Sequence, residues 1–337
     1  MAAIETRALR KVYPAPAAPK RRGRQGPPSP NGGPPAGAPR GEIVALHGLD
    51  LEVREGEFFG LLGPNGAGKT TTIGILTTRV KPTSGTALVG GADVTHQDVA
   101  VRQRIGVVPQ RPNPDRGLNV IENLVFHAAY FGIPSSLAVP RANALLDQLG
   151  ILDKAHAKVD EMSGGQQQRL MIARALIHEP RVIFLDEPTV GLDPQTRLAL
   201  WEILRRLHDE GRTIVMTTHY MEEADQLCDR IAIVDHGRLL ELDTPEALKE
   251  RAPGGTLIEL TLSADAASVA PAARAVDGVS RVDARGHVLH VYSDRGGRVI
   301  SPVIQAAEEG GVAVTNISLS EPSLETLFVA RTGRKLD

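Results

Sequence analysis

Short apolar runs recur between residues 42 and 250, and each is stopped by polar or turn-forming residues. They include FFGLLG at 58–63, RIGVVPQ at 104–110, RVIFLDEP at 181–188 and TIVMTTH at 213–219. Strands that are apolar on both faces suit a parallel sheet covered by helices on either side. The pattern therefore predicts an α/β core made of strand–helix units.

The pattern of apolar positions becomes helical over residues 112–180. Three runs in this part, at 120–132, 141–152 and 164–179, have the spacing of amphipathic helices. We expect a helical subdomain here, set between strands of the sheet.

The pattern changes again after about Pro253. Strand-like and helix-like runs follow in the order β-α-β-β-α-β, and SLETLFVARTG at 323–333 is typical of a final helix. This order matches the split βαβ unit of ferredoxin-like folds. We predict a small α+β domain over 253–337, after a first domain over 1–252.

A stretch rich in proline and glycine, at 14–41, separates two predicted strands at 4–13 and 43–53. It holds nine prolines, six glycines and no acidic residue, so it cannot build a core and is expected to be disordered. It is either a tail before the domain or an insert within a hairpin. Its basic KRRGR cluster indicates a solvated loop or, alternatively, a contact with anionic lipid.

Bulk composition narrows the class of protein. The 337 residues are 42% hydrophobic and 23% charged with a net charge of −2, which is typical of globular proteins without a general attraction to nucleic acid. The single cysteine, Cys228, excludes an intramolecular disulfide and fits a reducing compartment. Because no signal peptide or membrane-spanning run is recognisable, we expect a cytoplasmic chain that needs a partner for any membrane role.

A phosphate-binding loop is predicted at GPNGAGKT, between an apolar run and a helical pattern. It fits G-x-x-x-x-G-K-[ST], in which glycines let backbone N–H groups wrap phosphate oxygens. Lys69 would reach the β- and γ-phosphates, and Thr70 would offer its hydroxyl to Mg²⁺. The alternative is a glycine-rich turn that only opens a helix. The predicted loop comprises Gly63, Pro64, Asn65, Gly66, Ala67, Gly68, Lys69, Thr70 and Thr71.

Two carboxylates end the run RVIFLDEP, at the edge where α/β folds bind ligands. Asp186 would hold Mg²⁺, and Glu187 would act as general base on the attacking water. Acidic residues that merely end a buried strand are the plainer interpretation. A phosphate-binding loop upstream in the same sheet favours the catalytic one.

Gln110 and His219 each follow another apolar run. The Gln110 amide is placed to contact Mg²⁺ and the lytic water, and His219 is placed to hydrogen-bond a γ-phosphate oxygen. Taken singly, each residue is more often structural, so both depend on the other motifs.

The run MSGGQQQRL at 162–170 opens a helix whose free N–H groups would face an anion. An ordinary N-cap is the alternative, because serine is a preferred capping residue. The two glycines that follow Ser163, Gly164 and Gly165, instead favour close backbone approach.

In order along the chain, GPNGAGKT, Gln110, MSGGQQQ, VIFLDEP, GLDP and His219 resemble the motifs of the ATP-binding subunits of ABC transporters. The resemblance covers about residues 1–250, and six motifs in order are far more specific than any one. It implies a P-loop NTPase fold of the ABC type, with an antiparallel β subdomain beside the helical one. It also implies ATP and Mg²⁺. Met162 and Asn119 replace the usual Leu and Thr, and neither change removes a catalytic group.

The same resemblance implies a head-to-tail homodimer with two ATP molecules between the copies. The signature residues Ser163, Gly164, Gly165 and Gln166 of one copy would lie against the γ-phosphate held by the partner's Lys69. Asp193 would sit at the dimer seam. Tyr13 would stack on adenine, which makes 14–41 an insert in a hairpin rather than a tail. Because Glu187 and His219 are both present, a hydrolysing enzyme is implied.

Runs such as TTHYMEEADQLCDRIAIVDHGRL are similar to the daunorubicin-resistance-type exporters, which pair with ABC-2 permeases. This implies an ATPase held at the cytoplasmic face of the membrane by separate permease subunits, with no nucleic-acid partner. The alternatives are a non-transport soluble ABC ATPase and a pure binding or scaffold module. Residues near Gln110 and after it would meet the permease. The C-terminal segment is either a stabilising appendage or a contact with the second copy or the permease.

Overall fold

The computed structural model describes residues 2–14, 42–252, 255–320 and 322–332. These residues divide into two compact units. The first unit spans 1–57, 65–217 and 234–239, and the second spans 58–64, 218–233 and 240–337. Among the described residues, no helix combines the length and the apolar character needed to cross a membrane.

An antiparallel sheet in the first unit has the strand order β2-β1-β4-β5. Strands β1 and β2 pair in antiparallel fashion as far as the last residue of β1 and the first of β2, with Tyr13 opposite Ile43 and Pro14 opposite Glu42. Residues 15–41 thus stand between two strands that pair with each other, which is the position expected of an insert within a hairpin. The disorder predicted for this stretch falls outside the described residues. The strands are β1 (Ala2–Pro14), β2 (Glu42–Arg54), β4 (Ser84–Val89) and β5 (Ala92–Asp93).

Three parallel strands form the apolar centre of the first unit, as the uninterrupted apolar runs predicted. They lie in the order β6-β7-β8, and every residue of β7 and β8 is buried. Helix α5 packs against β6 and α6, and α1 packs against β7. The elements are β6 (Ile105–Val108), β7 (Val182–Asp186), β8 (Thr213–Thr218), α1 (Lys69–Leu76), α2 (Asp98–Arg104), α5 (Gly164–Leu176) and α6 (Pro194–Asp209).

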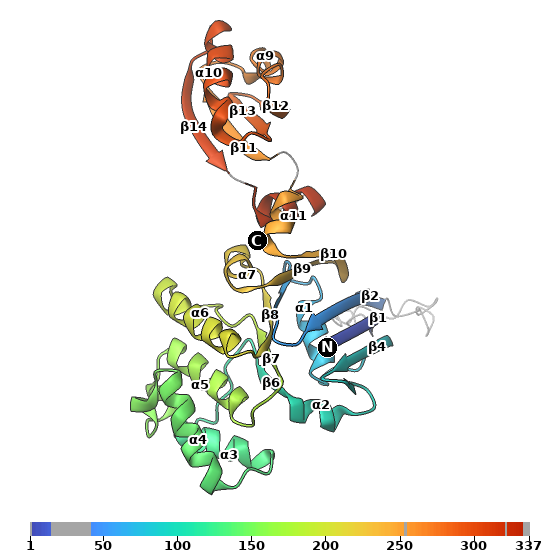
Figure 1. The fold of residues 1–337 in the computed structure, drawn as a ribbon, viewed down its shortest axis with the longest axis vertical. Coiled ribbons are helices and arrows are strands. Elements are labelled where there is room, and N and C mark those ends of the chain that lie inside the picture. The colour runs from blue at the N-terminus through green and yellow to red at the C-terminus, as the bar shows by residue number, and fades with distance from the viewer. Residues whose placement is uncertain (1, 15–41, 253–254, 321, 333–337) are drawn as a thin grey trace, which may run out of the picture. The chain divides into compact units, whose positions relative to one another are not determined.

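Helices α3 (Val120–Tyr130) and α4 (Ser135–Gln148) pack against each other and against α5. Figure 1 shows these three helices grouped together. Asn119 starts α3 with a capping box, in which its side chain accepts from the Glu122 N–H and the Glu122 carboxylate accepts from the Asn119 N–H. Helix α4 begins before the run at 141–152 that predicted it, and Pro140 lies inside it.

The second unit holds β3 (Phe58–Leu62), β9 (Arg230–Asp235) and β10 (Arg238–Asp243), with β9 between the other two. Strands β3 and β9 run parallel, and all five residues of β3 are buried. Helix α7 (Met221–Leu227) packs against β3. Helix α8 (Pro245–Glu250) follows β10 and is capped by Thr244, whose hydroxyl accepts from the Ala247 N–H at 3.2 Å.

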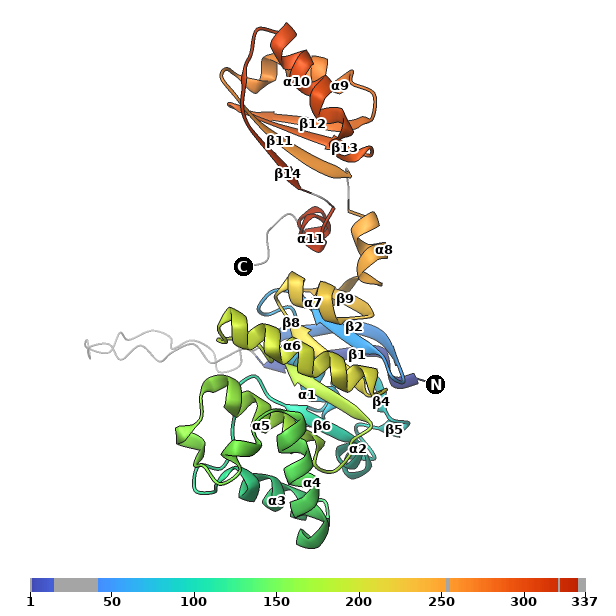
Figure 2. The same cartoon turned by 60° about the vertical axis from the view of Figure 1, so that its left-hand side comes forward.

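A separate antiparallel sheet follows α8, with the order β12-β13-β11-β14. Helices α9 and α10 share one apolar core with it, and Figure 2 shows both helices over the same face. The predicted order of strands and helices is observed, whereas the ferredoxin-like class stays a prediction. The elements are β11 (Thr256–Leu262), α9 (Ala270–Arg274), β12 (Val279–Arg285), β13 (Val288–Ser293), α10 (Ile300–Glu309), β14 (Val314–Ser320) and α11 (Leu324–Thr332).

Candidate active site

The predicted phosphate loop turns at two glycines with positive φ, Gly66 at 82° and Gly68 at 104°. A Cβ on Gly68 would lie 2.8 Å from Leu46 Cδ2 and 2.9 Å from the Ala45 carbonyl oxygen. Backbone conformation and space therefore both require glycine at position 68. Gly68 is the N-cap of α1, so the first free N–H groups of this helix belong to the loop.

Lys69 is the first residue of α1, and its side chain is only 4% exposed. Its Nζ lies 3.3 Å from Glu187 Oε1. Burial lowers the pKa of Lys69, and the nearby Glu187 carboxylate opposes that change. The sequence places these two residues far apart, and the fold joins them as a buried ion pair.

The other oxygen of the Glu187 carboxylate, Oε2, accepts a hydrogen bond from Gln110 Nε2 at 2.9 Å. Glu187 has a φ of 48°, which is uncommon for a residue other than glycine. Its backbone N–H is held by Thr217, at 3.1 Å from the carbonyl oxygen and 3.0 Å from Oγ1. Such a strained conformation persists only where the surroundings enforce it, and it is frequent at functional sites.

Asp186 is the last residue of β7 and is 6% exposed. Its Oδ1 accepts from Thr217 Oγ1 at 2.6 Å. Burial raises the pKa of Asp186, and the Thr217 hydrogen bond works in the opposite direction. Thr217 thus holds both carboxylate residues, and our sequence analysis missed it. No sequence signal singles out Thr217, because its place opposite Asp186 in the parallel register of the neighbouring strand is seen only in the fold.

A cavity of about 190 Å³ joins Tyr13 to the phosphate loop and to Asp186. Tyr13 lies at the end of β1, and Lys11 Nζ lies 4.8 Å from the centre of its ring. The structure therefore brings Tyr13 to the same cavity as the predicted loop residues. The cavity is lined by Tyr13, Thr70, Thr71, Ile73, Gly74, Arg79, Val80 and Asp186.

Ser163 caps α5 in a capping box with Gln166. The Ser163 Oγ accepts from the Gln166 N–H at 3.3 Å, and the Gln166 Oε1 accepts from the Ser163 N–H at 2.9 Å. The ordinary N-cap that we considered as the alternative is thus present. A Cβ on Gly164 would meet nothing within 4 Å, so packing within this chain does not require glycine at that position.

Thr196, which our sequence analysis also missed, links the signature segment to Asp193, which it predicted. Asp193 caps α6 and accepts twice from Thr196, from the backbone N–H at 3.0 Å and from Oγ1 at 2.6 Å. A Cβ on Gly165 would lie 2.3 Å from Thr196 Cγ2. Gly165 thus has a packing role within this chain, between α5 and α6.

We predict that Gly165→Ala destabilises the protein by roughly 1–3 kcal/mol, because the added methyl group overpacks the α5–α6 contact. Thr196→Ser removes Cγ2 and keeps the hydroxyl that binds Asp193, so it should recover most of the loss in the double variant. Thermal unfolding measures all three variants. Gly164→Ala is the control, and a loss as large as that of Gly165→Ala would contradict the steric reason.

His219 follows β8 directly and precedes α7. It is half-buried, and its ring centre lies 4.2 Å from that of Tyr220. Its contact with phosphate stays a prediction, as do the roles of the other site residues. Gly63 and Pro64 belong to the same unit as His219.

The phosphate loop, the buried lysine and the carboxylates after a buried parallel strand define a P-loop nucleotide hydrolase. Comparisons with known proteins identify the family. The profile described as "ABC transporter" matches residues 46–190. The linearmycin resistance ATP-binding protein LnrL of Bacillus subtilis (strain 168) is 36% identical over 300 residues, which cover 88% of this chain and 96% of LnrL.

One further sequence relative and one solved structure support the same family. The daunorubicin resistance ATP-binding protein DrrA2 of Streptomyces coeruleorubidus is 40% identical over 88% of this chain and 93% of its own length. The ATP-binding cassette MJ0796, solved as a dimer in a post-hydrolysis state with ADP and Pi, matches with a TM-score of 0.59 and 27% identity. That match covers 72% of this chain and 98% of the cassette. The chain belongs to the ABC transporter ATP-binding proteins, and it is an ATPase.

Proposed function

We propose that this protein is the ATP-hydrolysing subunit of an ABC-2-type exporter and drives transport through separate permease subunits. The observation that carries the proposal is the buried contact of Lys69 with Glu187, with Gln110 on the other carboxylate oxygen. The exporter class is supported by relatives whose names specify linearmycin resistance, daunorubicin resistance and Nod factor export.

The geometry suits a hydrolytic step in which Lys69 exchanges partners. The γ-phosphate of ATP competes with Glu187 for the Lys69 ammonium, because both are anions within reach of the same buried cation. Once Lys69 turns to phosphate, the Glu187 carboxylate accepts the proton of the attacking water. Gln110 keeps that carboxylate oriented through its amide N–H.

The residues around the loop fit Mg²⁺, which prefers oxygen ligands and retains several waters. Among the described residues, no group of three or more His, Cys, Asp or Glu side chains forms a dedicated metal cage. The Asp186 carboxylate and the Thr70 hydroxyl line one cavity, and Gln110 offers an amide oxygen while its nitrogen is bound to Glu187. These groups would hold the ion, which supplies positive charge to the phosphate oxygens.

Two copies of the chain would enclose ATP head to tail, with Ser163, Gly164, Gly165 and Gln166 of one copy against the nucleotide of the other. The dimeric state of the related cassette MJ0796 supports this arrangement. The N-terminus of α5 suits an anion because its free N–H groups carry partial positive charge. Asp193, which is exposed at the start of α6, would lie at the dimer seam. The dimer would work at the cytoplasmic face of the membrane.

Co-expression with a six-span permease from the same gene cluster tests this function. We expect the chain to co-purify with that membrane protein in detergent and to hydrolyse ATP faster in the complex than alone. Hydrolysis without association would remove the exporter assignment and keep the ATPase. If the purified chain hydrolysed no ATP either alone or with the permease, the entire proposal would be wrong.

A further inference from the structure

Helix α11 follows the C-terminal sheet in sequence but packs elsewhere. Among the residues whose burial is described, the core of that sheet extends from Ile258 to Val312 and contains no residue of α11. Helix α11 instead packs against α7 and α8, and Figure 2 shows it beside α8. Its residues Leu324, Leu327 and Phe328 are 2%, 0% and 0% exposed. Their spacing places them on one face of the helix, so this face is buried outside the C-terminal sheet.

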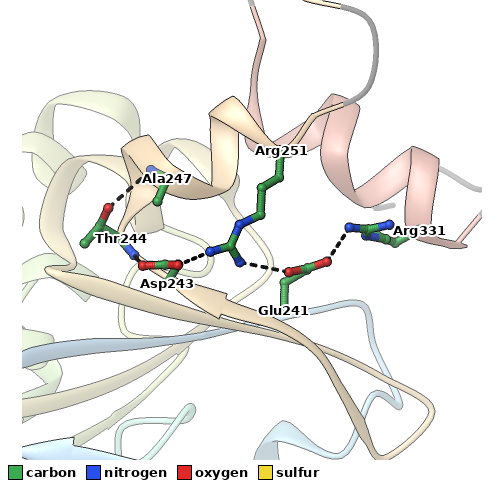
Figure 3. Close-up of polar contacts among 6 residues, drawn as sticks. All are labelled: Glu241, Asp243, Thr244, Ala247, Arg251 and Arg331. Atoms are coloured by element: carbon green, nitrogen blue, oxygen red, sulfur yellow. Dashed lines mark hydrogen bonds and ion pairs between the residues drawn. The ribbon is translucent and has the colours of Figure 1, made fainter.

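A polar network fastens the same contact, and Figure 3 shows it in full. Glu241 on β10 binds two arginines, Arg331 of α11 at 2.6 Å through Oε1 and Arg251 at 3.2 Å through Oε2. Arg251 also pairs with Asp243. The Glu241 side chain is only 14% exposed, so this carboxylate is better shielded from water than most surface ion pairs.

A second ion pair joins helix α8 to helix α7. Lys249 on α8 lies 2.6 Å from Asp225 on α7, and both side chains are less than one-third exposed. Glu223 and Ala224 of α7 are fully buried. Helix α7 thus packs against β3 and α11 and is joined to α8 by this ion pair, so a shift of α11 changes a direct contact of α7.

Helix α7 begins beside His219. Its N-cap is Tyr220, the next residue after His219, and the centres of the two rings are 4.2 Å apart. A helix end that shifts moves its capping residue with it, because the backbone is continuous. The position of the His219 imidazole therefore depends on how firmly α7 is held.

We propose that Phe328 and Arg331 of α11 are positioning residues that hold His219 in place through α7. This inference rests on the proposed ATPase function and on the contact with the γ-phosphate that the sequence analysis predicts for His219. An isolated nine-residue helix is not stable in water, so α11 is helical only while it is docked. Helix α11 thereby supports the residue predicted to act in hydrolysis, although it follows the accessory sheet in sequence.

Steady-state ATP hydrolysis by the full chain tests the proposal with Arg331→Glu. We expect kcat to fall about fivefold, as expected for loss of a partly shielded ion pair, with KM for ATP changed by less than about twofold. The kcat effect arises because His219 acts on hydrolysis, whereas ATP binding depends on the phosphate loop. Arg331→Lys keeps the charge and should restore most of kcat. Arg298→Glu makes the same charge change at an exposed site of the C-terminal segment and should have no effect.

A second pair of variants tests the apolar part of the contact. Phe328→Ala should lower kcat by on the order of tenfold, less than the roughly 10²-fold that a 1 Å misplacement can cost. Phe328→Leu fills most of the same space and should stay near the wild-type kcat. Hydrogen exchange of the amides of 219–227 should become faster in Phe328→Ala and Arg331→Glu, and not in their conservative counterparts.

The outcomes separate this inference from the proposed function. Unchanged kcat and unchanged exchange at 219–227 in both Phe328→Ala and Arg331→Glu would overturn the positioning role. So would a fall in kcat accompanied by an equal loss of ATP affinity and a lower melting temperature, since α11 would then only stabilise the fold. If His219→Ala kept the wild-type kcat, the hydrolytic role of His219 would be wrong instead.

Discussion

Glu187→Gln is expected to abolish ATP turnover while the protein still binds ATP. The general base contributes roughly 10²–10⁴-fold to such reactions, and glutamine cannot accept the proton of the attacking water. The substitution keeps the size of the side chain and a polar contact for Gln110, whose Nε2 lies 2.9 Å from Glu187 Oε2. Without hydrolysis, the ATP-bound dimer should accumulate. Phosphate release and light scattering with and without ATP measure the two effects.

Glu179→Gln is the matched control for this variant. Glu179 is another glutamate with positive φ, at 54°, and its exposed side chain contacts Arg141 instead of Lys69. This control should keep wild-type turnover and form no persistent dimer. Hydrolysis at the wild-type rate by Glu187→Gln would mean that another group is the base.

Lys69→Ala is expected to weaken ATP binding itself by at least about tenfold, because a charge-assisted hydrogen bond contributes roughly 1.5–3 kcal/mol. The nucleotide-free protein should also lose stability, since Glu187 would remain buried without its cation. That loss should be smaller when Glu187→Gln is already present, because no charge is then left unpaired. Calorimetric titration with an ATP analogue and thermal unfolding of the double-mutant cycle measure both effects.

Lys81→Ala is the control, because Lys81 is exposed and lies outside the cavity next to the loop. It should change neither affinity nor stability. Wild-type ATP affinity in Lys69→Ala would exclude the phosphate-binding role of this lysine.

The features that could be predicted from the sequence are those that depend on residue type and on neighbours close in the chain. A glycine-rich loop between a strand and a helix has few uses besides phosphate binding. Gly68 is required by its φ of 104° and because a Cβ there would lie 2.8 Å from Leu46 Cδ2. The buried strands β7 and β8 were predictable because their apolar runs have no polar face. The strands that flank residues 15–41 were predictable from their short apolar runs, although they also carry exposed positions, and Tyr13 at the end of β1 lines the cavity.

The ends of helices and the hydrogen-bond partners of the site residues were less predictable. Helix α4 begins at Ser135 although Pro140 follows within it, because Ala138 and Ala142 are buried on either side of that proline. Packing there outweighs the weak helix propensity of proline. Thr196 and Thr217 carry no sequence signal of their own, since threonine is common in strands and near helix starts. Their importance comes from the residues that pack beside them.

The sequence by itself thus determined the class of fold, the phosphate loop and the identity of the carboxylates that follow β7. These features depend on residue type and on spacing within a few residues. Only the tertiary structure decided that Lys69 pairs with Glu187, that Thr217 holds Asp186 and Glu187, and that α11 leaves the C-terminal sheet to pack against α7 and α8. The physical reason is that side-chain periodicity shows which face of an element is buried, whereas the element that covers that face depends on how distant parts of the chain pack.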